Sequence, residues 1–305
     1  CSSDLNVSGN LESNPHNQVH VDVGGNAPNG QTWGLMADPG IAALDPVFYL
    51  HHANIDRMWA HWNTNGNSNP TVSSWLKGPA AAGEREFIVP MPGGTSWVYT
   101  PADVDDLNQL NYTYDDLTAA AQSLKASNAL GVRLQKLGVQ SMATESKDSG
   151  QDTSADSELV GAHDGALLVK SSGARANVRL DSGVRKKLSA SLKAASTEAL
   201  PDRAYLQLEN VRGTRDAQTL QVFVNGHLAG GVALFGLRRA SLKDELHGGS
   251  GLRFELDITN IIDTLHLENA LEADSLDVKI LPSDAVDADA PISIGRVSVY
   301  RERHK

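Results

Sequence analysis

Hydrophobic and polar residues follow two different patterns along the chain. Before residue 138 apolar residues recur at helical spacing, whereas beyond residue 165 they alternate with polar residues. Alternation with a period of two is typical of a half-buried strand, and turn-forming residues separate the alternating stretches. These stretches cover residues 204–211, 219–225, 252–258, 276–281 and 292–300. The pattern predicts a multidomain α + β chain, in which a helical part precedes an antiparallel, jelly-roll-like β-sandwich at residues 166–305.

Residues 139–165 separate the two parts and fit neither pattern. They are rich in Ser, Asp, Glu, Thr and Gly, contain few hydrophobic residues and show no periodicity. A segment of this composition buries too little apolar surface to offset the entropy lost on ordering it. We therefore expect an acidic, flexible linker at 139–165, open to proteases, between a first domain at 1–138 and the β domain at 166–305.

The strongest helical pattern begins at Asp45. Its carboxylate can cap a helix N-terminus, and Pro46 suits the first helical position because an N–H there would be unpaired anyway. Four residues at offsets of 0, 4, 7 and 11 then share one face: Phe48, His52, Ile55 and Trp59. His52 therefore lies among large hydrophobic residues, while His51 points about 100° away and can pair or be solvated. Such a histidine is more often a hydrogen-bonded core residue than a ligand, so this helix alone defines no site.

A second pair of histidines lies upstream, again at helical spacing. Asn14 can cap a helix that begins at Pro15, which places His16 and His20 four residues apart on one face. Taken alone, such a pair is more typical of a surface helix. Combined with His52 on a facing helix, it favours a transition-metal site with three histidine ligands. Nitrogen ligands without a thiolate suit copper or zinc, and the ligand type does not choose between them.

The two segments together resemble the CuB half of the tyrosinase and catechol oxidase (polyphenol oxidase) family, in its plant type. The resemblance rests on residues 15–20, PHNQVH, and residues 45–59, DPVFYLHHANIDRMW. Members of this family carry a type-3 dicopper centre, in which three histidines hold each copper ion and O₂ is the co-substrate. The resemblance implies that His16, His20 and His52 are the copper ligands of this chain, in an α-helical half-domain.

The same resemblance implies roles for residues beside the ligands. Glu12 matches a glutamate that holds a water near the copper site, and Asn17 matches a position that helps this water take the proton of a phenol. In many plant-type members a phenylalanine hangs over the copper six residues before the Asp-Pro pair. Pro39 stands there in this chain, so we expect a more open mouth and a slight preference for tyrosinase activity over catechol oxidation alone.

The histidines of this sequence account for one copper ion. In the family, the CuA half precedes CuB and supplies three more ligands. Here five of the ten histidines lie within the first 61 residues, and the others are scattered among turn and strand signals. We expect a separate chain or further sequence to supply the CuA half. The chain opens on Cys1 rather than Met, which leads us to expect a processed product, a subunit or a fragment.

Two later segments resemble further parts of the plant-type enzymes. Residues 105–117 resemble a tyrosine motif that closes the catalytic domain, with Tyr112 and Tyr114 as structural residues. Residues 166–305 resemble, more weakly, the C-terminal domain named after a Lys-Phe-Asp-Val motif, with LQVFVN at 220–225 in place of that motif. In the family this domain can cover the copper site and keep the enzyme latent until the linker is cut. The alternative is a passive stability domain.

Composition narrows the possible partners. The formal net charge of −11 argues against nucleic acid, and no apolar run approaches the roughly 20 residues that span a bilayer. The single cysteine excludes an internal disulfide. The resemblance to the tyrosinase and catechol oxidase family implies a copper-dependent polyphenol oxidase that converts o-diphenols to o-quinones, and the slight preference for tyrosinase activity adds monophenols as substrates. This oxidase is complete only with the CuA half. The alternatives are a non-enzymatic fragment and a hemocyanin-like oxygen-binding protein.

Overall fold

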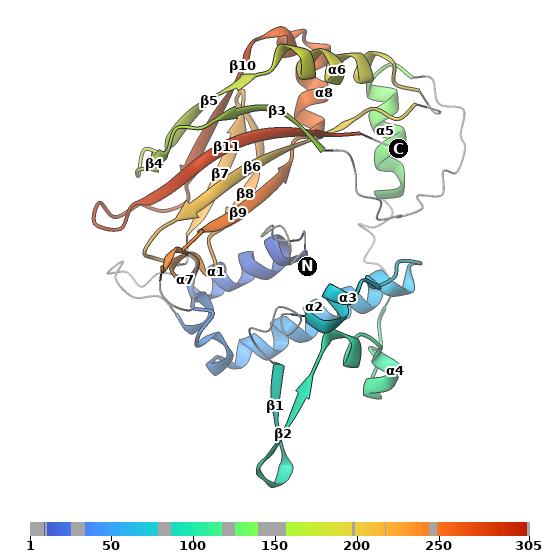
Figure 1. Cartoon of the computed structure of the whole chain (residues 1–305), viewed down its shortest axis with the longest axis vertical. Coiled ribbons are helices and arrows are strands. Elements are labelled where there is room, and N and C mark those ends of the chain that lie inside the picture. Colours follow the sequence, from blue (N-terminus) through green and yellow to red (C-terminus); the bar gives the residue numbers. More distant parts are fainter. Residues whose placement is uncertain are drawn as a thin grey trace.

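The structure is a computed structural model, which describes residues 9, 11–25, 34–78, 87–117, 126–139, 157–196, 199–216, 218–243 and 249–303. Within these residues, a helical part and a large antiparallel sheet lie at opposite ends of the molecule (Figure 1). Helices come first in the chain and the sheet follows, as the hydrophobic pattern predicts. Among the described helices, none has the length and hydropathy needed to cross a bilayer.

The first part consists of short elements around one long helix. In chain order its helical elements are η1 (Glu12–Asn17), α1 (Gln18–Gly24), η2 (Leu35–Ala37), η3 (Ala42–Leu44), α2 (Pro46–Thr64), α3 (Ser73–Lys77), η5 (Pro92–Gly94), η6 (Pro101–Asp103), α4 (Leu107–Leu110) and α5 (Ala126–Lys136). Strands β1 (Phe87–Met91) and β2 (Thr95–Tyr99) form an antiparallel hairpin that projects from this part (Figure 1).

Helix α2 begins where the sequence predicts. The Asp45 carboxylate accepts a hydrogen bond from the main-chain N–H of Val47 at 3.0 Å, and Pro46 is the first helical residue. The helix then runs for 19 residues to Thr64. Both signals act on the local backbone and need no distant contact, so they can be recognised from the sequence alone.

Among the described residues, nine strands build the sheet of the second part. They are β3 (Ser157–His163), β4 (Leu167–Val169), β5 (Ala174–Leu180), β6 (Arg203–Arg212), β7 (Thr219–Val224), β8 (His227–Ala233), β9 (Leu252–Asp257), β10 (Ser275–Pro282) and β11 (Ile292–Glu302). Their order is β8-β7-β10-β5-β3-β11-β6-β9, with β4 also paired to β11, and all these pairs are antiparallel.

The prediction of an antiparallel β domain is confirmed, whereas the jelly-roll-like sandwich is not. The described strands form one continuous sheet, and its end strands β8 and β9 contact each other, so that the sheet nearly closes into a barrel (Figure 1). Register shifts in the β11, β6 and β7 pairings help the strands to bend. Residues alternate between inside and outside in a barrel as in a sandwich, so alternation in the sequence cannot separate the two.

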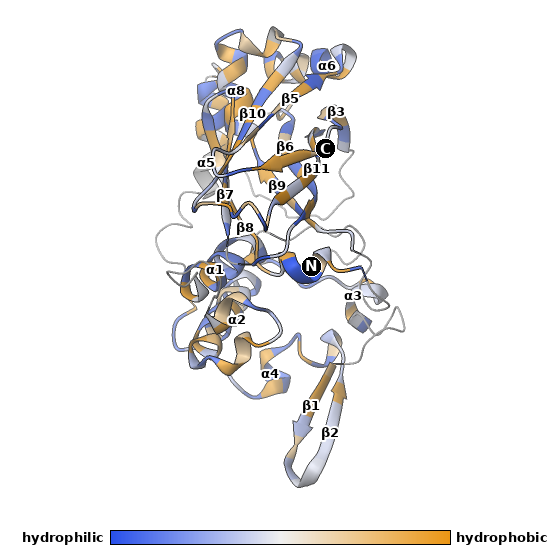
Figure 2. Cartoon of the chain, turned by 90° about the vertical axis from the view of Figure 1, so that its left-hand side faces the viewer, coloured by the Kyte–Doolittle hydropathy of each residue, from blue (hydrophilic) through white to orange (hydrophobic). Residues whose placement is uncertain are grey.

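The hydrophobic core lies almost entirely in the second part. Its buried residues form one cluster within the curled sheet and under helices α6 (Ser182–Lys193), α7 (Leu237–Ser241) and α8 (Thr259–Leu267). Hydrophobic residues follow the strands of this sheet in Figure 2. Among the described residues before position 118, the buried hydrophobic residues are only Val21, Met36, Ala37, Ala42 and Ala60. The helical part therefore has little core of its own.

Helix α2 also exposes large hydrophobic residues. Tyr49 is 63% exposed and Leu50 is 74% exposed, and Leu44, immediately before the helix, is 72% exposed. Val47 and Trp62 are exposed as well. Monomeric proteins rarely leave such a group of neighbouring apolar side chains in contact with water. The exposed side of α2 therefore has the amino-acid composition of a protein–protein interface.

The predicted boundaries of the two domains and the linker stay predictions. Two elements near these boundaries, α5 and β3, show how the structure relates to them. Helix α5 falls within the range assigned to the first domain, yet Arg133 on α5 forms an ion pair with Asp263 of the β part. Strand β3 begins at Ser157, inside the range assigned to the linker. Residues 140–156, the rest of the predicted linker up to that strand, lie outside the described residues.

The tyrosine segment packs against helix α2 through one carboxylate. The hydroxyl groups of Tyr112 and Tyr114 both donate to Asp56 Oδ2, at 2.6 and 2.5 Å. Burial and the neighbouring Asp56 carboxylate raise the pKa of Tyr112 to about 12, and the same causes raise the pKa of Tyr114. Both phenols therefore remain protonated donors, which fits the structural role expected for them.

Tyr114→Phe is expected to lower the free energy of unfolding by about 1.5 kcal/mol, because it removes a hydrogen bond to a charged group. Tyr112 is 42% exposed, so Tyr112→Phe should cost less. Urea unfolding of the full chain measures both changes. Tyr49→Phe, at an exposed position of α2, is the matched control. Equal unfolding midpoints for Tyr114→Phe and this control would contradict the role of the Asp56 contact.

Candidate metal centre

Four histidines from two helical segments meet on one side of α2. His16 and His20 come from η1 and α1, and His51 and His52 are adjacent on α2. The centroids of the four imidazole rings lie 4.7 to 5.5 Å apart in all pairs. The structure thus brings the three predicted ligands together and adds a fourth histidine to them.

Hydrogen bonds orient two of these rings. The Nδ1 atom of His20 lies 2.7 Å from the main-chain carbonyl oxygen of Met36, and Nδ1 of His16 lies 2.8 Å from Oδ1 of Asn17. When each Nδ1–H donates to its oxygen, Nε2 is left with a free lone pair. Histidines that bind a metal ion through Nε2 usually donate their Nδ1–H to an oxygen in this way. Asn17 is buried, with 5% of its surface exposed, so its amide holds His16 in a fixed orientation.

The choice between His51 and His52 as the third ligand is not settled by proximity. The ligand nitrogens of His16, His20 and His51 lie within 4.8 Å of one another. Nε2 of His52 lies 3.3 Å from Nε2 of His20, while Nε2 of His51 lies 3.2 Å from the carbonyl oxygen of His16. That carbonyl can accept the His51 proton, which corresponds to pairing, one of the two alternatives, pairing or solvation, that the sequence leaves open for His51. The assignment of His52 stays a prediction.

The cluster favours the neutral form of three of its histidines, His20, His51 and His52. The pKa of His20 is lowered from 6.5 to about 4. Burial is the largest cause, the neighbouring histidines also lower this pKa, and the hydrogen bond to the Met36 carbonyl partly opposes the shift. Burial, followed by the neighbours His16 and His51, lowers the pKa of His52 to about 4. The pKa of His51 is lowered, first by burial. Neutral imidazole is the form that binds a metal ion, so at pH 7 these residues are ready to do so.

The lowered pKa values predict an acid-sensitive fold for the metal-free chain. Unfolded histidines take up protons as the pH falls below 6.5, whereas folded His20 and His52 do so only near pH 4. The folded state therefore loses stability between pH 6.5 and 4. We expect the melting temperature of the metal-free chain to fall less steeply over this range in His20→Gln than in the unaltered chain. Parallel curves for the two proteins would contradict the pKa shift of His20.

The β part covers the histidine cluster with an aromatic ring. Phe235 lies between β8 and α7, and its ring stacks on His20 with a centroid distance of 4.1 Å and an interplanar angle of 15°. It meets His16 edge to face at 5.9 Å. On the α2 side, Phe48 stacks on His52 at 4.0 Å. Sequence analysis found Phe48 beside His52 and missed Phe235, which has no motif around it.

Contacts beside Phe235 fasten it to the helical part. Arg238 Nη2 lies 2.6 Å from Asp38 Oδ2, and the Arg238 main-chain N–H donates to Oδ1 of the buried Asp216 at 2.9 Å. Gly236 has a φ of +79°, which favours glycine, and a Cβ there would lie 3.5 Å from Pro39. Pro39, the position where plant-type members often carry phenylalanine, thus lies close to the segment that covers the histidines.

The two other predicted site residues differ in their surroundings. Glu12 is exposed at the start of η1, four residues before His16, and the non-helical Asn14 lies between them. Asn17 is buried and contacts a predicted ligand directly. The backbone at Asn14 is extended, with φ of −153° and ψ of 122°, where the sequence predicts a helix cap. The residue roles of Glu12 and Asn17 toward a water and a phenol stay predictions.

Comparisons with known proteins match both parts of the chain. Residues 2–65 match the family model described as the common central domain of tyrosinase, and residues 156–302 match a domain of unknown function (DUF7868). The tyrosinase HcTyr1 of Hahella sp. (strain CCB-MM4) is 30% identical over 313 residues, which cover 97% of this chain and 56% of that protein. Catechol oxidase B, chloroplastic, of Solanum tuberosum is 40% identical over 70 residues, 22% of this chain and 12% of that protein.

Solved structures give a similar picture at lower identity. A latent apple tyrosinase has a TM-score of 0.47 and 18% identity, and covers 96% of this chain and 56% of its own. A recombinantly expressed latent aurone synthase (polyphenol oxidase) has a TM-score of 0.49 and 17% identity, with 96% and 52% covered. The chain thus spans about half the length of HcTyr1 and of these two structures.

Proposed function

This chain belongs to the tyrosinase and catechol oxidase (polyphenol oxidase) family, and on that premise we propose that it forms the CuB-bearing part of a copper-dependent phenol oxidase. The observation that carries this proposal is the cluster of four histidine rings between η1, α1 and α2. The proposed reaction is the oxidation of o-diphenols to o-quinones with O₂. The tyrosinases and polyphenol oxidases among the relatives support it over an oxygen carrier.

The donor set fits copper. It consists of imidazole nitrogens, and two of the rings have Nδ1 engaged by an oxygen so that Nε2 is free. Two Nε2 atoms, of His20 and His52, face each other at 3.3 Å, and a shared metal ion would satisfy both lone pairs. We propose His16, His20 and His52 as the ligands. Copper held here would supply one half of a dicopper centre, and the completed pair would activate O₂ and accept the two electrons of the diphenol.

The remaining residues of the cluster would position the ligands and move a proton. Asn17 and the Met36 carbonyl fix the ring orientations of His16 and His20. Phe48 supports the His52 ring by stacking. We propose Glu12 as the base that takes the proton of a bound phenol through a water, because the family resemblance assigns this role to the glutamate four residues before His16 and its side chain is exposed to solvent. With this base, monophenols would be substrates as well.

A second set of histidines must complete a dicopper centre, and we propose that a CuA-bearing helical segment packs on the exposed face of α2. The exposed Leu44, Val47, Tyr49 and Leu50 and the sparse core of the helical part support this. The same segment would form the other wall of the pocket that binds the phenolic substrate. It would belong to a longer form of this polypeptide or to a separate chain.

We also propose that the β part keeps the centre latent. Phe235 stacks directly on His20, where it would compete with a substrate ring for the same position. The Arg238–Asp38 ion pair holds the covering segment in place. In this proposal the β part is a regulatory cover, and the passive stability role is the alternative that a test must exclude.

The test of the proposed function is quinone formation by the copper-loaded protein together with its CuA-bearing segment. Catechol and tyrosine are offered separately, and o-quinone absorbance is followed. We expect turnover of catechol, and loss of turnover in His20→Ala but not in His227→Ala, which replaces an exposed histidine on β8. Reversible O₂ binding without quinone formation would instead identify an oxygen carrier. Quinone formation that survives His20→Ala would overturn the site.

A further inference from the structure

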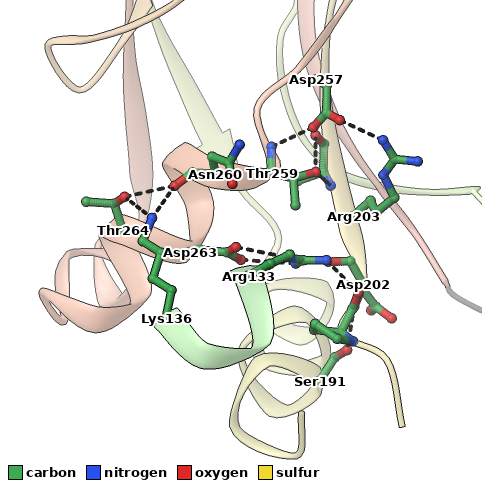
Figure 3. Close-up of polar contacts among 12 residues, drawn as sticks. Arg133, Lys136, Ser191, Asp202, Arg203, Asp257, Thr259, Asn260, Asp263 and Thr264 are labelled. Atoms are coloured by element: carbon green, nitrogen blue, oxygen red, sulfur yellow. Dashed lines mark hydrogen bonds and ion pairs between the residues drawn. The ribbon is translucent and has the colours of Figure 1, made fainter. Parts of the chain in front are cut away.

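Helix α5 connects the two parts of the chain, and its contacts are with the β part. It spans Ala126–Lys136 and lies against α8 and the beginning of β6 (Figure 3). The two family models match residues 2–65 and 156–302, so this helix falls outside both. Its position in the sequence assigns it to the copper part, whereas its contacts assign it to the sheet.

One buried arginine carries most of these contacts. The Arg133 guanidinium forms a two-pronged ion pair with Asp263 on α8, with N–O distances of 2.8 and 3.0 Å. Its Nη1 and Nη2 atoms also donate to the main-chain oxygens of Pro201 and Asp202, at 2.9 and 2.6 Å (Figure 3). Arg133 is 8% exposed and Asp263 is fully buried. A buried ion pair satisfied on all sides in this way fixes α5 in a single position.

Three further residues of the same turn extend the contact. Lys136 Nζ donates to Thr264 Oγ1 at 2.8 Å and to the Asn260 carbonyl oxygen at 3.2 Å, both on α8. Leu134 is 5% exposed, and Leu137 packs against the buried cluster of the sheet. Polar and apolar contacts thus come from the same turn of α5. The helix is built into the β part.

We propose that α5 is a strap that keeps the β part bound to the copper part after the chain is cut between residues 139 and 157. Such a cut falls after α5, so α5 stays covalently joined to the copper part while its contacts hold the β part. A cut between residues 117 and 126 leaves α5 on the β part and removes the strap. Cleavage in the predicted linker therefore does not by itself release the β part. The proposal concerns binding of the two pieces and is independent of oxidase activity.

Two variants of the full chain test this directly. One carries a site-specific protease sequence in place of residues 144–150, and the other carries it in place of residues 119–125. After complete cleavage, the dissociation constant of the two pieces is measured with an affinity tag at residue 1. The contacts of Phe235 and Arg238 with the helical part are common to both cut forms. We expect the form cut at 144–150 to bind on the order of a hundredfold more tightly.

Substitutions on α5 distinguish a loss of the contacts between α5 and the β part from a general loss of stability of the β part. Arg133→Leu should weaken binding only in the form cut at 144–150, because in the other form α5 already belongs to the β piece. Lys136→Ala, which removes contacts at the helix surface, should act in the same direction with a smaller effect. Gln135→Ala, at an exposed position of the same turn, is the control. Thermal unfolding of each uncut variant shows whether the β part still folds. Equal dissociation constants for the two cut forms, or equal effects of Lys136→Ala in both, would overturn the proposal.

Discussion

Phe235→Ala should raise the rate of catechol oxidation by about fivefold at low substrate concentration. The Phe235 ring stacks on His20 and touches His16, so it occupies the position that the proposed function assigns to an aromatic substrate. A stacked aromatic pair contributes roughly 1 kcal/mol of free energy in addition to the hydrophobic effect of the area it buries. Losing this pair changes the free-energy difference between the covered and the open state of the site by a similar amount. The initial rate of o-quinone formation measures the change in the complete enzyme. The rate at which a copper chelator strips this chain alone should rise in parallel.

Leu228→Ala is the control for Phe235→Ala, because Leu228 is an exposed apolar residue on the neighbouring strand β8. It should leave both rates unchanged. Arg238→Leu breaks the ion pair with Asp38 and should act in the same direction as Phe235→Ala. Unchanged chelation and unchanged oxidation in Phe235→Ala would show that the β part does not obstruct the site, and the passive stability role would then stand.

His20→Ala should abolish copper binding and o-quinone formation. His20 is the most buried histidine of the cluster, with 1% of its surface exposed, and its tautomer is set by the Met36 carbonyl. Its removal takes away one of three proposed nitrogen ligands and leaves a gap that water can fill only weakly. Copper content by elemental analysis measures the loss. His227→Ala, on the exposed surface of β8, should keep its copper.

The adjacent histidines of α2 provide an internal comparison for the same experiment. We expect His52→Ala to lose copper as His20→Ala does. His51→Ala should retain it, because Nε2 of His51 is engaged by the His16 carbonyl. The reverse result would assign His51 as the third ligand. Full copper loading in both single variants would mean that neither is required and would contradict a three-histidine site that includes α2.

Local signals in the sequence predicted the elements that carry the site. The cap at Asp45 and Pro46 sets the start of α2, and helical spacing places His16 and His20 on one side of the same cluster. Helical spacing does not separate His51 from His52 as ligands, because both imidazoles reach the cluster from neighbouring positions on the helix. A periodicity argument treats only one of them as facing inward.

The features that sequence analysis missed depend on contacts between distant residues. Arg133 and Asp263 are 130 positions apart, and Phe235 belongs to a different part of the chain from the histidine it covers. No local pattern marks either partner. Alternation predicts the strands themselves, but their assembly into one continuous, nearly closed sheet depends on which strands pair. That choice is made by the packing of the whole domain.

Copper bound per chain is the measurement that tests the central claim most directly. The purified chain is saturated with copper, freed of excess metal and analysed for metal and intact mass, beside a triple variant with alanine at His16, His20 and His52. We predict one copper ion per chain in the unaltered protein and none in the triple variant. Equal copper in the two proteins, or none in either, would contradict the assignment of this histidine cluster as a copper site.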